Sequence, residues 1–212
     1  MKNLFLIALL TIATLANAGK NKVLETNYKF TIGSKTALST YIHEATLKDV
    51  EKAWKDIMKD AKAKIKSKKD ELHADDAILP SITTHPMDIY AAFVEDKNGV
   101  AVYITVDFGG AFISSTSHPK EYQDLSSLLS DFGYNQTKIA IDEKLSNAEK
   151  ELKKIEDDYE KEMKNEQSMK DDIEKLKDKI SKSKDEQENQ KAAIEAQKKL
   201  LNEINQKKSK LL

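Results

Sequence analysis

Residues 88–108 read DIYAAFVEDKNGVAVYITVDF, and their pattern determines the architecture of the globular part of the chain. Asn-Gly between two segments of alternating polarity is the strongest short-range pattern for a β-hairpin. A two-residue turn at Asn98 and Gly99 places Phe93 opposite Ile104 and collects the apolar side chains on one face. The stretch therefore predicts an antiparallel hairpin with one covered face and one mixed face.

The mixed face of this hairpin carries two tyrosines, Tyr90 and Tyr103. Aromatic side chains on an uncovered sheet face form a candidate contact patch. We therefore take this pair as a candidate surface patch.

The segment before the hairpin predicts further strands and one helix. Thr46 followed by Asp49 resembles a capping box, and an apolar stripe at three- and four-residue spacing extends from there to Ile65. A lysine-rich turn is expected to end this helix, with a solvated acidic loop after it. Strands are expected at residues 29–32, 37–43 and 77–84, the last either at an edge or broken at Pro80.

The segment after the hairpin predicts a second helix. Pro119 suits a first helical position, and an apolar stripe runs on to Phe132. Gly133 either caps this helix or is a weak point within it. Because the phase of the stripe changes between Phe132 and Leu145, the globular part is expected to end near residue 140. The prediction is an α+β domain, residues 19–140, with a small, mostly antiparallel sheet covered by two helices.

Residues 141–212 are expected to form a long helical arm of coiled-coil type. No glycine or proline follows Tyr134, and lysines and acids alternate with apolar residues at heptad spacing. With Leu145 at heptad position a, eleven of the apolar residues at a and d positions form a candidate association seam: Leu145, Leu152, Ile155, Tyr159, Met169, Ile173, Leu176, Ile180, Ile194, Leu201 and Ile204.

Two arrangements of the arm remain open at this point. One is a single long helix, favoured by the lack of turn residues. The other is an antiparallel helical hairpin that folds back within residues 181–190, where the seam is weakest. The e positions begin with Glu149 and Glu156 and continue with lysines, so antiparallel packing is slightly favoured over parallel packing.

The first 18 residues have the pattern of a signal peptide. Lys2 precedes an apolar run, and Ala16, Asn17 and Ala18 form a small-x-small cleavage site. The run is too short to be a membrane helix. The mature protein is therefore expected to begin at Gly19 and to be exported, to the periplasm or beyond the cell, without a transmembrane segment.

The composition excludes several kinds of site. The chain has no cysteine, which excludes disulfides, thiol nucleophiles and thiolate metal sites. All its basic residues are lysines, and the net charge is −1. Arginine is the usual bidentate reader of phosphate and guanine, so we expect no nucleic-acid partner. Nothing indicates a cofactor or a specific small molecule.

Two groups of residues are candidate metal or cation ligands. The four histidines lack the spacing of a metalloprotease site, so they are expected to be surface or core-edge residues, with His85 and His118 as the pair for a dispersed metal site. The acids at 70–71 and 75–76 lack the spacing and the glycine of an EF-hand. We therefore expect no metal site.

The segment from Gly109 to His118 is a candidate ligand site. Gly109 and Gly110, followed by serines and a helix start, suggest an anion cradle, but a turn with a capping segment is the expected structure. Ser115 or Ser117 beside His118 suggests a nucleophile and its base, yet adjacent residues seldom meet in the required geometry. Because the chain also lacks a GxSxG elbow, we expect no enzymatic activity.

The residue runs 88–91, 98–100, 107–115 and 118–119, followed by a lysine- and glutamate-rich tail, resemble a group of small exported bacterial proteins of unknown function. The resemblance implies an α+β domain with a coiled-coil tail. It implies no activity, ligand or catalytic residue.

The expected function is that of a non-enzymatic exported scaffold or adaptor. Its arm would associate with a second copy or with a helical protein partner. One alternative is a periplasmic holdase chaperone whose helical arm clasps unfolded chains. Another is a ligand- or cell-wall-binding module with its site between Gly109 and His118.

Overall fold

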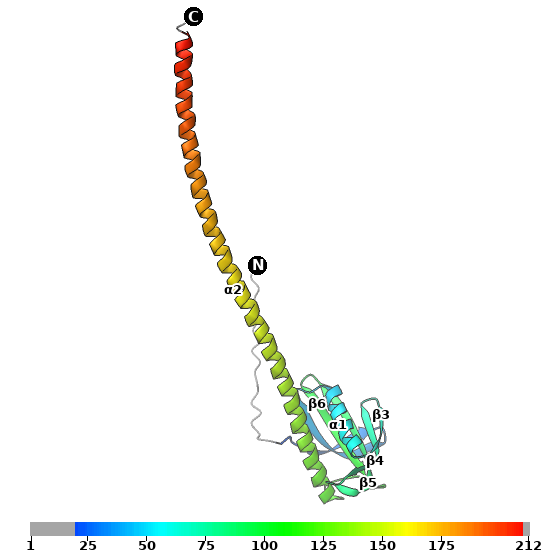
Figure 1. Cartoon of the computed structure of the whole chain (residues 1–212). Helices are drawn as coiled ribbons and strands as arrows, with labels where there is room; N and C mark the ends of the chain where they lie inside the picture. The colour runs from blue at the N-terminus through cyan, green and yellow to red at the C-terminus, as the bar shows by residue number, and fades with distance from the viewer. Residues whose placement is uncertain (1–19, 210–212) are drawn as a thin grey trace. The chain divides into compact units, whose positions relative to one another are not determined.

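The computed structural model describes residues 20–209, so the predicted signal peptide and cleavage site lie outside the described residues. The chain divides into two compact units, one up to Asn147 and one from Ala148. The elements are β1 (Leu24–Phe30), β2 (Gly33–His43), α1 (Leu47–Asp60), β3 (Lys64–Lys68), β4 (Glu71–Leu79), β5 (Thr83–Asp96), β6 (Gly99–Asp107) and α2 (Pro119–Ser209) (Figure 1).

The first unit is built on one six-stranded sheet with the strand order β1-β2-β6-β5-β4-β3. All five neighbouring pairs are antiparallel, whereas the sequence predicts a mostly antiparallel sheet. The strand expected at residues 37–43 is the second half of β2. Its side chains Leu38, Thr40 and Ile42 are buried, so they share the inner face at period two.

The predicted register of the central hairpin is wrong by two residues. Phe93 pairs with Val102 rather than with Ile104, and the turn lies between Asp96 and Gly99. The side-chain period of a strand is two, so this shift keeps the apolar side chains on the inner face. Neither Lys97 nor Asn98 has a positive φ, so the turn is not of type I′, the type that an Asn-Gly pair favours.

Helix α1 begins as predicted at the cap Thr46, whose hydroxyl accepts a hydrogen bond from the Asp49 N–H. Its buried residues Val50, Trp54 and Met58 are spaced by four and form one stripe. They belong to the same apolar cluster as the inner face of the sheet. The core of the first unit therefore lies against α1.

The helix ends earlier than its apolar stripe predicts. Lys62 has a φ of 61°, which ends helical geometry, and residues 64–68 form strand β3 instead of a lysine-rich helical turn. The acidic segment is likewise not a loop, because Glu71, Asp75 and Asp76 belong to β4. Strand β4 ends just before Pro80, which matches its expected role as a breaker.

Helix α2 begins at Pro119, as predicted. Leu125, Leu129 and Phe132 are buried and belong to the apolar cluster of the sheet and α1. The Phe132 ring meets Trp54 edge to face, with 5.2 Å between ring centroids. Gly133 does not end the helix, which continues without interruption.

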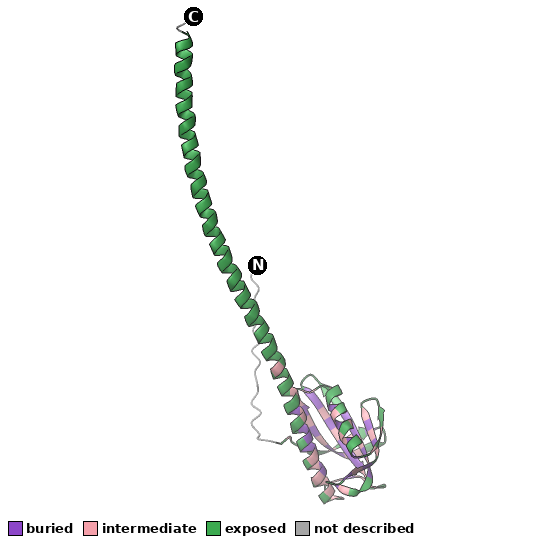
Figure 2. Cartoon of the chain, in the orientation of Figure 1, coloured by how far each residue is buried: buried purple, intermediate pink, exposed green. Residues whose placement is uncertain are grey.

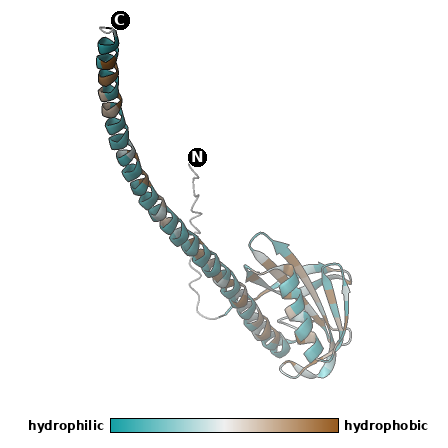
Figure 3. Cartoon of the chain, turned by 45° about the horizontal axis from the view of Figure 1, so that its top comes forward, coloured by the Kyte–Doolittle hydropathy of each residue, from teal (hydrophilic) through white to brown (hydrophobic). Residues whose placement is uncertain are grey.

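The second unit consists of helix α2 from Ala148 to Ser209. The helix is unbroken between Ser181 and Gln190, so the single long helix is correct and the helical hairpin is wrong. Every described residue from Ala148 onward is exposed (Figure 2). Apolar and polar residues alternate along this unit (Figure 3), and no helix among residues 20–209 is long and apolar enough to cross a membrane.

Candidate functional site

The predicted association seam lies fully exposed along α2. Its eleven side chains have exposed fractions between 47% and 66%. They occupy a and d positions of one heptad register, so they share one face of the helix. Single exposed leucines are ordinary on a protein surface, but apolar residues that recur on one face of a helix, even with polar interruptions, are typical of an interaction surface. The eleven are Leu145, Leu152, Ile155, Tyr159, Met169, Ile173, Leu176, Ile180, Ile194, Leu201 and Ile204.

The polar residues of the second unit form ion pairs along the helix. Lys170 pairs with Glu166 at 2.7 Å, and Lys198 pairs with Glu195 at 3.0 Å. Such exposed pairs are worth about 0.3–0.5 kcal/mol each. They support the helix without covering the seam, which leaves the apolar face unpartnered.

The seam register also continues backward into the first unit. Tyr134 and Ile141 occupy d positions of the same heptads, and both are exposed. Leu125 and Phe132, on another face of the same stretch of helix, are buried in the core. This explains the phase change that the sequence shows after Phe132: one face of α2 packs in the core, and a different face carries the seam.

Tyr90 and Tyr103, the candidate surface patch, are half-buried on the outer face of the sheet. They belong to a small cluster with Tyr28, Phe30 and two alanines. Tyr28 and Tyr103 stack with 4.2 Å between ring centroids. Burial raises the pKa of Tyr90, and the nearby Asp88 carboxylate adds to this. The two tyrosines therefore lie in one aromatic cluster and not as separate surface residues.

One group of three potential metal ligands occurs among the described residues, namely His73, Asp75 and Asp88. The His73 Nε2 lies 3.8 Å from an oxygen of Asp88, and its ring stacks on Tyr90. Lys66 lies 3.7 Å from Asp75 and competes with a cation for that carboxylate. Neither His85 nor His118, the pair that the sequence suggests, belongs to this group.

Sequence reasoning missed the His73 group, although part of its pattern was readable. His73 and Asp75 alternate with buried Leu72 and Ala74, which places both on the outer face of β4. Asp88 comes from the next strand, and a register shift between Ala74 and Ala77 sets its position. Such an irregularity is a β-bulge, and the alternation of apolar and polar residues along the sequence does not reveal a bulge.

The segment from Gly109 to His118 forms a compact polar loop before α2. Ser117 Oγ lies 2.9 Å from His118 Nδ1, so these adjacent residues do meet. The same hydroxyl also donates to the Phe112 carbonyl and contacts Ser114 Oγ at 2.7 Å. The Ser115 N–H donates to Glu25 at 3.1 Å. These contacts fit the expected turn and capping segment.

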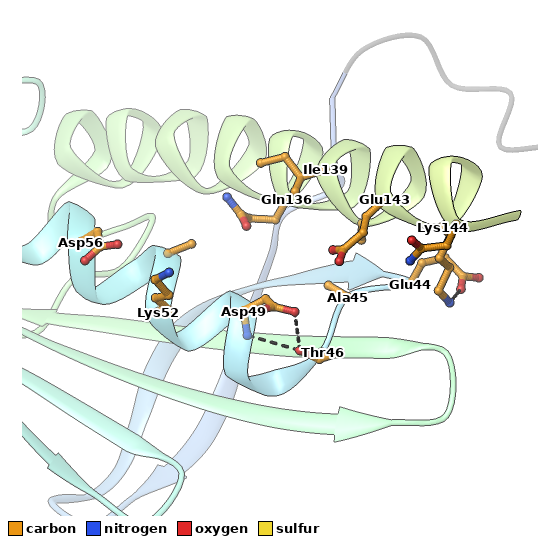
Figure 4. Close-up of a pocket in the computed structure, with 13 residues that line it drawn as sticks. Glu44, Ala45, Thr46, Asp49, Lys52, Asp56, Gln136, Ile139, Glu143 and Lys144 are labelled. Carbon is orange, nitrogen blue, oxygen red and sulfur yellow. Dashed lines mark hydrogen bonds and ion pairs between the residues drawn. The ribbon is translucent and has the colours of Figure 1, made fainter. Parts of the chain in front are cut away.

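A cavity of about 500 Å³ lies elsewhere in the first unit, between the start of α1 and residues 136–147 of α2 (Figure 4). Its walls carry both signs of charge, with Asp49, Lys52 and Glu143 in the lining and Glu44 paired with Lys144. Ile139 is the large apolar side chain in its lining. The sequence pattern does not indicate this cavity.

No family model matches the chain, and no curated protein or solved structure matches it either.

Proposed function

We propose that this protein is a non-enzymatic, exported scaffold or adaptor that associates through a coiled coil formed by its α2 seam. The row of exposed apolar residues from Leu145 to Ile204 carries this proposal. Export rests on the signal-peptide pattern of residues 1–18. The resemblance to small exported bacterial proteins is consistent with this role.

An isolated helix is marginal in water, and most helical order in proteins comes from packing of an apolar face. From Ala148 to Ser209 no side chain is buried within the chain, yet apolar side chains recur at heptad spacing. A second helix packed on the seam would remove these side chains from water. Association would thus supply the packing of an apolar face that the second unit does not have by itself.

The first unit has a supporting role in this proposal. We infer that α1 and the first turns of α2 together form the cover of the sheet, which is supported by the edge-to-face contact of Trp54 with Phe132. With that core closed, the exposed side chains Tyr134 and Ile141, which continue the seam register, stay available for association. The Ser117–His118 contact adds no enzymatic role, because the serine hydroxyl is engaged in the capping loop.

Light scattering or sedimentation of the mature chain tests the proposal. Changing Ile173, Leu176 and Ile180 together to Ser removes three consecutive apolar positions of the seam. We expect the wild type to be oligomeric and the triple variant to be monomeric, with the first unit still folded. A matched control changes Glu174, Asp178 and Lys182 to Ser, three residues in the same stretch but at outer heptad positions.

The control should keep the molecular mass of the wild type in solution, because its substitutions leave the seam intact. The helix propensities of the substituted residues are similar in the two variants, so a difference between them reports on the seam. A wild-type chain that is monomeric at high concentration with a fully helical arm would overturn self-association. A control variant as monomeric as the seam variant would overturn the role of the seam.

A further inference from the structure

We infer that the occupant of the α2 seam is a second copy of this chain, packed antiparallel, with the two-fold axis between Glu174 and Lys175. This rests on the proposed function and adds to it the identity, direction and register of the partner. It is carried by the arrangement of the seam residues about that axis and by the charges beside them.

Across this axis, most of the apolar seam residues of one copy face apolar residues of the other copy. In an antiparallel pair, each a position of one helix faces a d position of the other. About an axis between 174 and 175, five of the nine layers from 145 to 204 join two apolar residues. They are Leu145 with Ile204, Ala148 with Leu201, Ile155 with Ile194, Met169 with Ile180, and Ile173 with Leu176.

The polar interruptions of the seam match each other as well. Glu162 faces Gln187 of the second copy, and Glu166 faces Ser183. In a parallel pair in register, Glu162 would face Glu162 of the second copy, and Glu166 would face itself in the same way. Burying like charges opposite each other is costly, so the interruptions disfavour the parallel pair. The two remaining layers, which contain Leu152 and Tyr159, each join an apolar residue to a glutamine.

The flanking charges favour the same direction. At the e positions, Glu149 lies beside Lys198 of the second copy, and Glu156 lies beside Lys191. At the g positions, Asp172 lies beside Lys179. Two lysine pairs oppose these, Lys170 with Lys177 and Lys144 with Lys207, but the attractive pairs are more numerous. By the two-fold symmetry each pair occurs twice.

Neighbouring registers lose this match. A shift of one heptad in one direction places Glu162 against Ile194, and a shift in the other direction places it against Ile180. Either shift buries a carboxylate against an apolar side chain, which is unfavourable. The register about the axis between Glu174 and Lys175 is therefore more favourable than the neighbouring registers, as a specific homodimer requires.

The absence of cysteine makes a direct test possible, because any introduced thiol is unique in the chain. Ala148→Cys and Leu201→Cys place thiols on residues that face each other in the proposed pair but are far apart along one helix. Each single variant is purified alone, and one is labelled with ¹⁵N. The two are then unfolded together in urea, refolded as a mixture, and treated with a short bis-maleimide, since disulfides accept only a narrow geometry.

We expect cross-linked dimer in the mixture, joining one labelled and one unlabelled chain, at roughly tenfold the yield of either variant alone, because facing thiols have a high effective concentration. Circular dichroism of each variant verifies that the helix is intact. A single-thiol chain cannot cross-link internally, so this product reports contact between copies.

The other outcomes separate the two proposals. Efficient cross-linking of each variant with itself would overturn the antiparallel direction and leave self-association standing. An oligomeric mass without cross-linking would overturn the register. A monomeric mass without cross-linking would overturn self-association, and with it the inference built on it.

Discussion

A Cβ atom on residue 99 would lie 2.1 Å from the carbonyl oxygen of Ile42, so the backbones of Gly99 and Ile42 approach each other more closely than any other residue allows. Gly99 begins β6, pairs with His43 on β2, and has a φ of +152°. Real side chains do not tolerate such a distance, and the obstacle is backbone rather than a movable side chain. This close approach, and not a type I′ turn, is why glycine follows Asn98.

Gly99→Ala should therefore destabilise the first unit by about 3 kcal/mol, from overpacking against Ile42 together with backbone strain. Gly110→Ala is the matched control, because Gly110 also has a positive φ, of +101°, but no atom lies within 4 Å of the place that its Cβ atom would take. Urea denaturation of both variants measures the difference. Equal losses at the two positions would show that strain alone matters.

Gly133→Ala should also destabilise the first unit, although alanine is a better helix former than glycine by about 1 kcal/mol. A Cβ atom at residue 133 would lie 2.5 Å from Asn21 Nδ2 and 3.0 Å from Thr40 Oγ1. Asn21 is fixed there because its Nδ2 donates to the Tyr41 carbonyl and its own backbone carbonyl accepts from the Ser130 hydroxyl. The new methyl group must displace this anchored side chain.

A double-mutant cycle with Asn21→Ala isolates this contact. In the Asn21→Ala background the same change at Gly133 should cost less, because the nearest obstructing atom is gone. If the cost of Gly133→Ala is the same in both backgrounds, Asn21 is not the obstacle.

A chain of residues 19–140 should fold by itself. The last buried residue of the first unit is Thr137, whose hydroxyl accepts a hydrogen bond from the His43 N–H. Truncation after residue 140 removes the Lys144–Glu44 ion pair, and an exposed pair is worth about 0.2–1 kcal/mol. A cooperative thermal transition with little change in stability is expected. A truncated chain with a collapsed amide NMR spectrum would mean that the rest of α2 completes the core.

Acid should weaken the first unit partly through Asp96. The Tyr41 hydroxyl donates to this carboxylate at 2.6 Å, and the Asn98 N–H donates at 2.7 Å. These bonds, with that of Tyr41 the stronger effect, hold the pKa of Asp96 below its usual value. A lowered folded-state pKa stabilises the fold above the unfolded-state value, about 3.9, and this contribution is lost as pH falls through the folded-state value.

Tyr41→Phe should raise the pKa of Asp96 toward its ordinary value, which a carboxyl carbon NMR titration measures. Asp96→Asn should in turn lower the pKa of Tyr41 from about 12, while burial, the larger cause, keeps it above the ordinary phenol value. An unchanged Asp96 titration in the Tyr41→Phe variant would contradict the assignment.

The sequence alone predicts the antiparallel sheet, the helix that begins after Thr46 and the long C-terminal helix, because each has a strong period. It does not determine the register of the hairpin, since pairing Phe93 with Val102 or with Ile104 keeps the same faces. Strand β3 was missed because Ile65 fits both an extended helical stripe and an alternating strand, and only the φ of Lys62 decides between them.

The candidate sites likewise divide into one that the sequence predicts and others that it does not. The seam is local to one helix, so spacing along the chain suffices to find Ile173, Leu176 and the other seam residues. The His73 group and the cavity lined by Asp49 and Glu143 combine residues from different elements. Their assembly depends on strand register and helix packing, which a single sequence does not encode in any short pattern.

Trp54 is the single tryptophan of the chain, and it is buried against Phe132 of α2. From Ala148 onward the only aromatic residue is Tyr159. Intrinsic tryptophan fluorescence therefore reports the closure of the core and does not report changes along the seam. Far-ultraviolet circular dichroism, in contrast, is dominated by the long helix. The molecule thus has two separate optical signals, so the closure of its core and its helix content can be followed in one sample without an added label.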